Sequence, residues 1–282
     1  MSAAANLPKS WPAPAKLNLF LHITGLREDG YHLLQTVFQF LDFGDELVFT
    51  PREHGRIQRL TEIPGVPAEQ DLVVRAAKLL KQQAGLDAGV DIEIDKRLPM
   101  GGGLGGGSSD AATALVALNR IWDCGLTLEQ LAKLGLQLGA DVPVFIRGQA
   151  AWAEGVGEEL IPVDLPEPWY VVLIPPVNVS TAKVFSDPQL IRDCPAITIR
   201  DFLAGAGGNV CEPLVRKHYS QVDAALSGLS EYAASRLTGT GACVFAAFEQ
   251  EQQARAAWDG LKDHWQGFVA KGLNWSPLLD EV

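Results

Sequence analysis

Residues 98–110 have the composition of a loop that binds phosphate. Their sequence, LPMGGGLGGGSSD, contains six glycines and stands between an alternating, strand-like segment and an apolar, helix-like one. Residues without a Cβ let the backbone bend sharply and approach a ligand closely. Backbone N–H groups can then converge on an anion, and the helix that follows adds its unpaired N-terminal donors. A flexible linker usually mixes glycine with serine between polar segments, so the ordered flanks favour a phosphate loop.

Two common phosphate loops do not account for this segment. The P-loop of nucleotide triphosphatases needs a lysine after its last glycine, whereas Ser108 follows Gly107 here. The dinucleotide fingerprint G-x-G-x-x-G matches at positions 101, 103 and 106, but a run so rich in glycine produces such a match easily. That fingerprint also follows a buried parallel strand, and residues 90–95 alternate polar and apolar side chains instead. An oxidoreductase is therefore disfavoured.

Composition limits the partners of the chain. The 282 residues are 47% hydrophobic and 20% charged, which is ordinary for a globular protein and allows one large domain or two of usual size. The net charge of −11 disfavours nonspecific binding to nucleic acid. It also repels phosphate, so a phosphate ligand needs local donors.

Cysteine usage and hydropathy indicate a cytoplasmic protein with no membrane partner. The four cysteines lie far apart and form no C-x-x-C pair, which argues against a zinc site or a disulfide framework and suits a reducing compartment. Residues 1–14 show no secretory signal, and no apolar run is long enough to span a bilayer.

Periodicity predicts the elements that carry these residues. Residues 16–23 alternate as a half-buried strand, with Lys16 and Asn18 adjacent on its polar face. Ser108 or Ser109 is expected to cap the helix after the glycines, and Gly139 to end the next one. The remaining patterns predict helices over residues 72–83, from 111 onward, 127–139, 221–229 and 250–265, and strands over 46–50, 90–95, 142–146, 170–174 and 243–248.

The strand patterns define the fold class. They alternate rather than running continuously apolar, which favours an α+β fold with largely antiparallel sheets over a doubly wound parallel sheet. A proline cluster at 162–168 separates two stretches of regular pattern. We therefore expect an N-terminal domain over residues 1–164 and a C-terminal domain over residues 165–282.

Five separated motifs resemble those of one kinase superfamily. The loop PMGGGLGGGSS at 99–109 resembles the phosphate loop of the galactokinase, homoserine kinase, mevalonate kinase and phosphomevalonate kinase (GHMP) superfamily. Four further segments resemble superfamily motifs and occur in the expected order along the chain: PAKLNL at 14–19, DGYH at 29–32, GADVP at 139–143 and RLTGTGA at 236–242. The long glycine run looks like one branch in particular, the kinases of a cytidine-diphosphate-linked methylerythritol in the non-mevalonate isoprenoid route.

The resemblance implies a fold and a reaction. The fold is a ribosomal-S5-like N-terminal α/β domain with a ferredoxin-like C-terminal α+β domain, and the active site lies in the cleft between them. The reaction is transfer of the γ-phosphoryl group of ATP, with Mg²⁺, to the tertiary 2-hydroxyl of the cytidylyl alcohol. The ligands of the metal and the choice between monomer and homodimer stay open.

The resemblance also assigns roles to residues. Asp141 corresponds to the carboxylate that accepts the hydroxyl proton, and Lys16 to the catalytic lysine beside it. From sequence alone, Asp141 could instead be a helix cap and Lys16 a solvated surface lysine. The loop that would cradle the phosphates of ATP comprises Pro99, Met100, Gly101, Gly102, Gly103, Leu104, Gly105, Gly106, Gly107, Ser108 and Ser109.

The acceptor is expected to contact six further residues. Tyr31 and Phe185 would stack on cytosine, and His32 would read the edge of the base. Packing in the core is the other reading of the two aromatic rings. The remaining three are Asn18, which would offer an amide, and Thr240 and Gly241, which would approach from the C-terminal half or simply form a tight turn.

Two other functions remain open at this point. The first is a GHMP-fold kinase of a different small alcohol, such as homoserine or mevalonate. The second is a noncatalytic nucleotide-binding protein that keeps the fold. The Tyr31-His32 pair argues against the first, and the presence of both Lys16 and Asp141 argues against the second.

Overall fold

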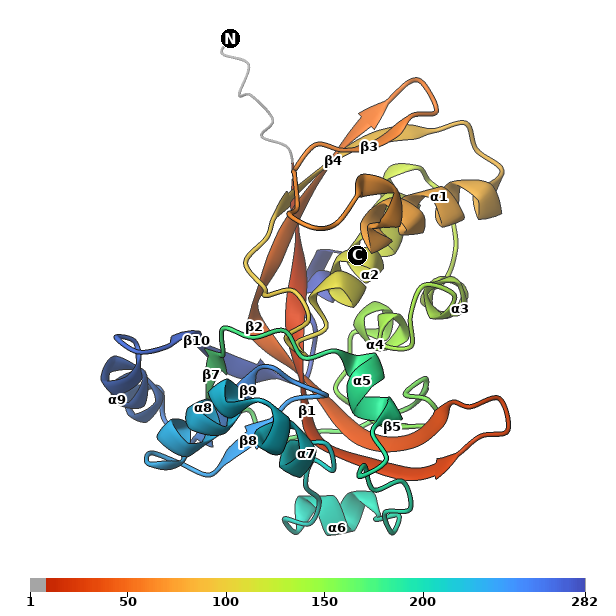
Figure 1. Ribbon diagram of the computed structural model, residues 1–282. Coiled ribbons are helices and arrows are strands. Elements are labelled where there is room, and N and C mark those ends of the chain that lie inside the picture. The colour runs from red at the N-terminus through yellow and green to blue at the C-terminus, as the bar shows by residue number, and fades with distance from the viewer. Residues whose placement is uncertain (1–8, 282) are drawn as a thin grey trace.

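The computed structural model describes residues 9–281, which form one mixed sheet flanked by helices (Figure 1). The main path of the sheet runs β3-β4-β2-β10-β7-β9-β8, while β1 and β5 pair with β2, and β6 pairs with β5. Only β3 and β4 pair in parallel within this sheet, which confirms the expected α+β class. The strands are β1 (Ser10–Leu26), β2 (His32–Arg52), β3 (Ile57–Arg59), β4 (Gly89–Asp95), β5 (Ala151–Glu154), β6 (Glu159–Pro162), β7 (Trp169–Ile174), β8 (Ser235–Leu237), β9 (Val244–Phe248) and β10 (Gln266–Leu273).

A long hairpin of β1 and β2 runs through the length of the molecule (Figure 1). Where the sequence predicts a short strand over residues 46–50, the structure has the continuous strand β2 from His32 to Arg52. Gly44 permits this, because a Cβ there would lie 2.2 Å from the carbonyl oxygen of Ala13 on the partner strand. Irregularities in the β1 register fall on both sides of Lys16–Asn18. Such bulges redirect side chains, and here they border the residues that the motif singles out.

Helices cover the two ends of the sheet. The long helices are α1 (Leu72–Ala84), α2 (Gly106–Ile121), α3 (Leu128–Leu136), α8 (Ser220–Ser230) and α9 (Glu251–Leu261), and the short ones are α4 (Val142–Arg147), α5 (Thr181–Ser186), α6 (Ile199–Leu203) and α7 (Glu212–His218). One hydrophobic core lies between α1–α4 and strands β1, β2 and β4, and a second between α7–α9 and strands β7–β9. The expected helices over 72–83, 221–229 and from 250 are confirmed, although the last ends at Leu261.

The C-terminal segment returns to the N-terminal half. Strand β10 pairs with β7 and, through Gly272 and Leu273, also with β2. The 3-10 helix Pro277–Glu281 follows, and Leu278 is buried in the core of the N-terminal half. The boundary at residues 164 and 165 stays a prediction. The sheet itself is continuous across it, so backbone pairing between β10 and β2 links the halves in addition to the chain itself.

Four local predictions are wrong. Residues 142–146 form a helix rather than a strand, because a short apolar run has no decisive period and Pro143 suits the first turn of a helix. Helix α2 begins at Gly106 after the left-handed Gly105, so neither serine is its N-cap. Helix α3 keeps the expected capping box but ends at Leu136, before Gly139. The polar face of residues 16–23 is buried, because the glycine loop and the segment around Thr238 cover it.

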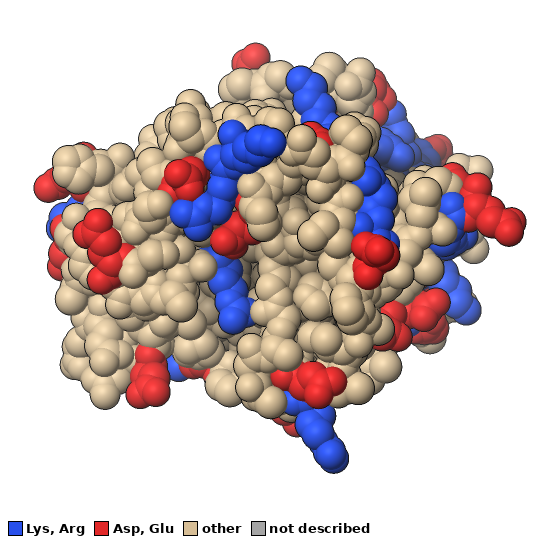
Figure 2. All heavy atoms as spheres, turned by 60° about the horizontal axis from the view of Figure 1, so that its bottom comes forward, with Lys and Arg blue, Asp and Glu red and all other residues tan. Residues whose placement is uncertain are grey.

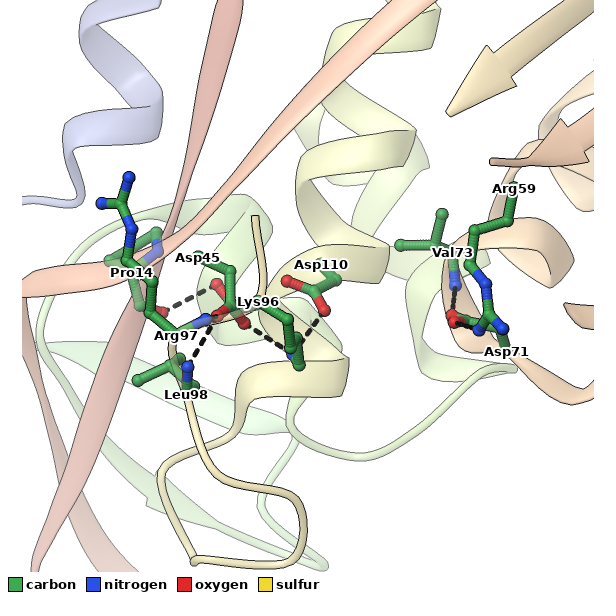
Figure 3. A network of polar contacts seen from close by, with 10 residues as sticks. Pro14, Asp45, Arg59, Asp71, Val73, Lys96, Arg97, Leu98 and Asp110 are labelled. Atoms are coloured by element: carbon green, nitrogen blue, oxygen red, sulfur yellow. Dashed lines mark hydrogen bonds and ion pairs between the residues drawn. The ribbon is translucent and has the colours of Figure 1, made fainter. Parts of the chain in front are cut away.

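Replacing Asp71 tests how strongly α1 is anchored. The Asp71 carboxylate caps the helix by accepting the N–H of Val73 at 2.9 Å, and it pairs with the buried guanidinium of Arg59 (Figure 3). Asp71→Ala leaves that guanidinium without its counter-ion, so the free energy of unfolding should fall by about 3–5 kcal/mol in urea titrations. Asp259→Ala, which breaks an exposed pair with Lys262, serves as the control and should change stability little. Equal losses in both variants would contradict the assignment.

Candidate active site

A cavity of about 330 Å³ lies where the two halves of the chain meet. Strands β1 and β2, the glycine loop, the start of α4, helix α5 and the loop after β8 all contribute to its wall. Its lining includes eight of the residues that the sequence proposes: Lys16, Asn18, Gly103, Gly105, Ser108, Asp141, Phe185 and Thr240. Segments distant in sequence therefore converge on one space.

The ammonium group of Lys16 lies at the centre of this wall. The side chain is only 4% exposed, and its Nζ lies 2.5 Å from Oδ1 of Asn18, 3.2 Å from the carbonyl oxygen of Gly103 and 3.3 Å from Oδ2 of Asp141. The ring of Phe38 adds a contact with the cation at 5.2 Å. Burying an ammonium group is costly unless it is paired and hydrogen-bonded. Lys16 has both kinds of partner, and the reading as a solvated surface lysine is wrong.

Asp141 presents a carboxylate to the cavity. It occupies the N-cap position of α4, but its side chain makes no capping hydrogen bond. The side chain is 36% exposed, in contrast to its buried partner Lys16. A carboxylate beside a fixed ammonium, with one side open to a cavity, can accept a proton from a bound hydroxyl group.

The glycine loop has the backbone geometry of an anion cradle. The φ angles of Gly101, Gly103 and Gly105 are +66°, +77° and +75°, while Gly102 and Leu104 between them have no positive φ. Glycines of positive φ at alternate positions can turn neighbouring N–H groups toward one concavity. Helix α2 starts directly after this run, so the unpaired donors of its first turn face the same region.

The C-terminal half holds this loop from the other side. The N–H of Cys243 donates to the carbonyl oxygen of Gly102 at 3.1 Å, and the hydroxyl of Thr238 donates to that of Gly103 at 3.2 Å. The same hydroxyl accepts the N–H of Asn18 at 3.0 Å. A Cβ on Gly103 would lie 2.3 Å from the carbonyl oxygen of Thr238. The loop is therefore packed between β1 and the segment after β8, which fixes its conformation.

The two serines of the loop differ in their surroundings. Ser108 lines the cavity, whereas Ser109 is buried and its hydroxyl donates to the carbonyl oxygen of Pro14 at 2.7 Å. Ser109 thus anchors α2 to β1, and of the two hydroxyls only that of Ser108 faces the cavity. Met100 lies at the outer edge of the loop with its side chain largely exposed.

Two of the three proposed base-binding residues, His32 and Phe185, lie together beside the cavity. The rings of His32 and Phe185 stack with centroids 5.0 Å apart and an interplanar angle of 23°. Phe185 lines the cavity, and Tyr31 precedes His32 at the turn of the β1–β2 hairpin, where it is 64% exposed. Burial and the guanidinium of Arg192 lower the pKa of His32, which favours its neutral form.

Thr240 and Gly241 come to the cavity from the C-terminal half. The hydroxyls of Thr240 and Thr181 lie 2.8 Å apart, which ties the loop after β8 to helix α5. Gly241 stands behind this contact with a φ of +88°, and a Cβ there would lie 2.9 Å from the side chain of Leu237. Thr240 can reach a ligand, while Gly241 shapes the turn that presents it.

Three residues at the site escape the sequence analysis. Thr36 binds the amide of Asn18 through its hydroxyl at 3.0 Å, Thr238 joins Asn18 to the glycine loop, and Arg192 binds His32. Thr238 lies inside the motif at 236–242, so its place beside the glycines of that motif could have marked it as a candidate site residue. Thr36 and Arg192 stand in no motif, and only the fold brings them to their partners.

A buried ionic cluster supports the glycine loop from behind (Figure 3). Nζ of Lys96 lies 2.5 Å from Oδ2 of Asp45 and 2.7 Å from Oδ2 of Asp110. The other oxygen of Asp45 accepts the N–H groups of Arg97 and Leu98, at 2.6 and 2.7 Å, where the chain enters the loop. Burial, together with the neighbouring charge of Asp45, raises the pKa of Asp110 to about 8.

The face drawn in Figure 2 shows no large basic patch that could attract phosphate. On the face drawn in Figure 2, basic and acidic side chains lie in mixed groups, and broad uncharged areas separate these groups. Candidate donors for an anion at the cavity are the backbone N–H groups of the loop and the ammonium group of Lys16. In the described part of the chain, no helix is long and apolar enough to cross a membrane.

Family models match both halves of the chain. The model described as GHMP kinases N terminal domain matches residues 71–149, and the model described as GHMP kinases C terminal matches residues 194–267. The solved structure of a mevalonate kinase, 15% identical, has the same fold with a TM-score of 0.71 over 94% of this chain and 99% of that one. The chain is a GHMP kinase in fold and family.

More similar proteins narrow the assignment. A 4-diphosphocytidyl-2-C-methyl-D-erythritol kinase of Nitrosococcus oceani is 62% identical over 270 residues, which cover 96% of each chain. One of Pseudomonas aeruginosa is 59% identical over 269 residues and 95% of each chain. The crystal structure of a 4-(cytidine 5'-diphospho)-2C-methyl-D-erythritol kinase, 32% identical, has a TM-score of 0.82 over 94% of this chain and 99% of that one. The protein belongs to the 4-diphosphocytidyl-2-C-methyl-D-erythritol kinase family.

The raised pKa of Asp110 predicts a pH dependence of stability. A carboxyl whose pKa rises from 3.8 to about 8 on folding stabilises the protein at low pH, and this contribution is lost as the pH rises toward about 8. Asp110→Asn removes the titrating group. The free energy of unfolding of the wild type should decline over this range, by at most about 1.4 kcal/mol per pH unit from this residue. The variant should lack that component.

Urea titrations at several pH values measure this difference. Glu93→Gln, which changes an exposed carboxylate on β4, controls for loss of charge alone and should keep the wild-type slope. An unchanged slope in Asp110→Asn would show that the carboxyl of Asp110 titrates normally.

Proposed function

We propose that the protein transfers the γ-phosphoryl group of ATP to the 2-hydroxyl of 4-diphosphocytidyl-2-C-methyl-D-erythritol and releases ADP. Membership of the kinase family supports the reaction. The observation that carries the site assignment is the pair of Lys16 and Asp141, with Nζ and Oδ2 3.3 Å apart at the wall of the cavity. The glycine loop borders this pair on one side, and the ring stack of His32 and Phe185 lies beyond it.

The chemistry at the pair is a balanced displacement. The 2-hydroxyl oxygen forms a bond to the γ-phosphorus while the bond from that phosphorus to the bridging oxygen breaks and leaves ADP. Asp141 accepts the hydroxyl proton, and Lys16, paired with that carboxylate, offsets the negative charge of the phosphoryl group. A tertiary alcohol is crowded and weakly acidic. Positioning and charge stabilisation therefore dominate the catalysis.

The phosphates of ATP belong on the loop from Pro99 to Ser108. Its alternating backbone and the first turn of α2 supply N–H donors, and the ammonium of Lys16 adjoins the carbonyl of Gly103. These donors form a local field that overcomes the net charge of −11 of the whole chain. The pocket for ATP is therefore built mainly from backbone.

Mg²⁺ is part of the proposal, and the residues present fit it. Magnesium prefers oxygen ligands and usually binds one or two protein oxygens, with water and substrate phosphates completing its shell. Asp141 and Ser108 both present oxygen atoms to the cavity. Within residues 9–281 no group of three His, Cys, Asp or Glu side chains could hold a metal alone. When bound, the ion neutralises phosphate charge, and nucleotide oxygens must complete its coordination.

The acceptor enters from the side of His32 and Phe185. Its cytosine would stack on the rings of Phe185 and Tyr31, with the imidazole of His32 at the edge of the base. Asn18 and Thr240 lie nearer the pair of Lys16 and Asp141, where the alcohol must be held.

The four cysteines are unpaired in the structure, in keeping with a cytoplasmic location.

A coupled ADP-release assay tests the reaction. Four acceptors are compared with Mg²⁺-ATP: the cytidylyl compound, the free methylerythritol, mevalonate and homoserine. Turnover confined to the first supports the proposed reaction and the base-reading site together. Turnover with another alcohol would overturn the acceptor assignment, and no turnover with any would overturn the kinase function.

Asp141→Asn tests the proton acceptor. An amide of similar size cannot take the hydroxyl proton, so kcat should fall by about 10²–10⁴-fold. Binding of ATP, measured by calorimetry, should remain. Asp164→Asn, a change of the same kind outside the cavity lining, should leave kcat intact. A near-normal kcat in Asp141→Asn would remove this residue from the chemistry.

Tyr31→Ala tests the proposed stacking of the base on the Tyr31 ring. Stacking of a base on an aromatic side chain is worth about 1–3 kcal/mol, so the KM for the cytidylyl acceptor should rise by roughly 5- to 150-fold. The KM for ATP should stay unchanged. Tyr232→Ala removes another exposed tyrosine and provides the matched control. If both KM values rise equally, Tyr31 does not contact the base.

A further inference from the structure

Arg192 makes an unusual set of contacts in the segment after α5. Its Nε donates to Nε2 of His32 at 3.1 Å, and its Nη1 donates to the carbonyl oxygen of Leu190 at 3.0 Å. Its Nη2 donates to the carbonyl oxygens of Phe185 and Asp187, at 2.7 and 2.8 Å. One guanidinium thus donates hydrogen bonds to the backbone at and after the end of α5 and to the imidazole of His32 at the start of β2.

The hydrogen bond to His32 determines where the imidazole carries its proton. A guanidinium has donors and no acceptor, so Nε2 of His32 must be the acceptor in this contact. In a neutral imidazole the other nitrogen, Nδ1, then bears the hydrogen. The neighbouring positive charge and partial burial both lower the pKa of His32 and disfavour the doubly protonated ring. His32 is therefore a single donor through Nδ1.

The same guanidinium also places the ring on which His32 stacks. Phe185 is in the last turn of α5, and Arg192 binds its carbonyl oxygen while holding the His32 ring 5.0 Å from the Phe185 ring. A cation at the C-terminal end of a helix satisfies carbonyl groups that have no partner within the helix. The stack and the proton position consequently depend on one side chain.

We infer that Arg192 is a positioning residue that sets base specificity, by holding His32 as an Nδ1–H donor against the ring of Phe185. This inference rests on the proposed function, because it concerns the base of the cytidylyl acceptor. A fixed donor binds a base edge that offers an acceptor, as N3 of cytosine does, and repels the N3–H of uracil. Without Arg192, His32 can adopt either tautomer, and this discrimination is lost.

Arg192→Met and Arg192→Lys test the inference. Methionine removes every donor, while lysine keeps the charge without the planar fork. In Arg192→Met the KM for the cytidylyl acceptor should rise about tenfold, the loss expected for one or two hydrogen bonds. The preference over the uridylyl analogue should shrink, and kcat and the KM for ATP should stay within about twofold. Arg192→Lys should be intermediate, and Arg200→Met, an exposed arginine on α6, should behave as wild type.

Nitrogen-15 NMR of the His32 ring gives a readout that does not require turnover. The wild type should show a protonated Nδ1 and an unprotonated Nε2, and Arg192→Met should show a mixture. If the tautomer is unchanged in both variants, or if all kinetic constants fall together, the inference is overturned. If the wild type phosphorylates none of the acceptors, the proposed function fails, while the NMR result still decides whether Arg192 fixes the tautomer.

Discussion

The ammonium group of Lys16 is buried, and three separate parts of the chain supply its partners. Asn18 comes from the same strand, Gly103 from the glycine loop and Asp141 from the start of α4. A buried charge is costly until each of its hydrogen bonds is made. Removing any partner would therefore disturb the other two. This single group couples the strand, the phosphate loop and the carboxylate, which are the parts that a phosphoryl transfer needs within a few ångströms.

The C-terminal half stabilises this arrangement without contributing a charge to the pair. Thr238 connects Asn18 to the glycine loop through one hydroxyl, and Cys243 binds the loop through its backbone N–H. The continuous sheet, in which β10 pairs with both β7 and β2, fixes how the two halves sit against each other. The loop thus keeps its conformation through packing on both sides, although glycine residues by themselves favour no single conformation.

The proposed function assigns a different kind of interaction to each end of the cavity. At one end, the proposal has backbone N–H groups and Lys16 act on the charge of the phosphates, because an acidic protein can provide positive charge only locally. At the other end, the proposal places the base of the acceptor against aromatic rings and the imidazole of His32. Stacking tolerates any base, so selection there depends on where one proton lies on His32. Arg192 controls that proton from a position outside the cavity lining.

The strongly periodic elements and the motifs can be predicted from the sequence. Helix α1, the capping box at Thr127 and strand β7 follow from local patterns, because their stabilising contacts lie within a few residues. The short helix α4 does not, since its apolar run is compatible with either structure until neighbouring segments pack on it. The motifs at Lys16, the glycines and Asp141 indicate a kinase by resemblance, but they carry no distances.

Only the tertiary structure decides what the residues do to one another. The sequence alone places Lys16 on a polar strand face, and the fold buries that face under the glycine loop and the segment around Thr238. In the sequence, a long stretch of chain separates His32 from Arg192, and the fold makes these two residues hydrogen-bonding partners. Local pattern determines elements because backbone hydrogen bonds and periodic burial are short in range. Burial, ion pairing and proton position depend on groups distant in the chain, so they arise only when the whole sheet assembles.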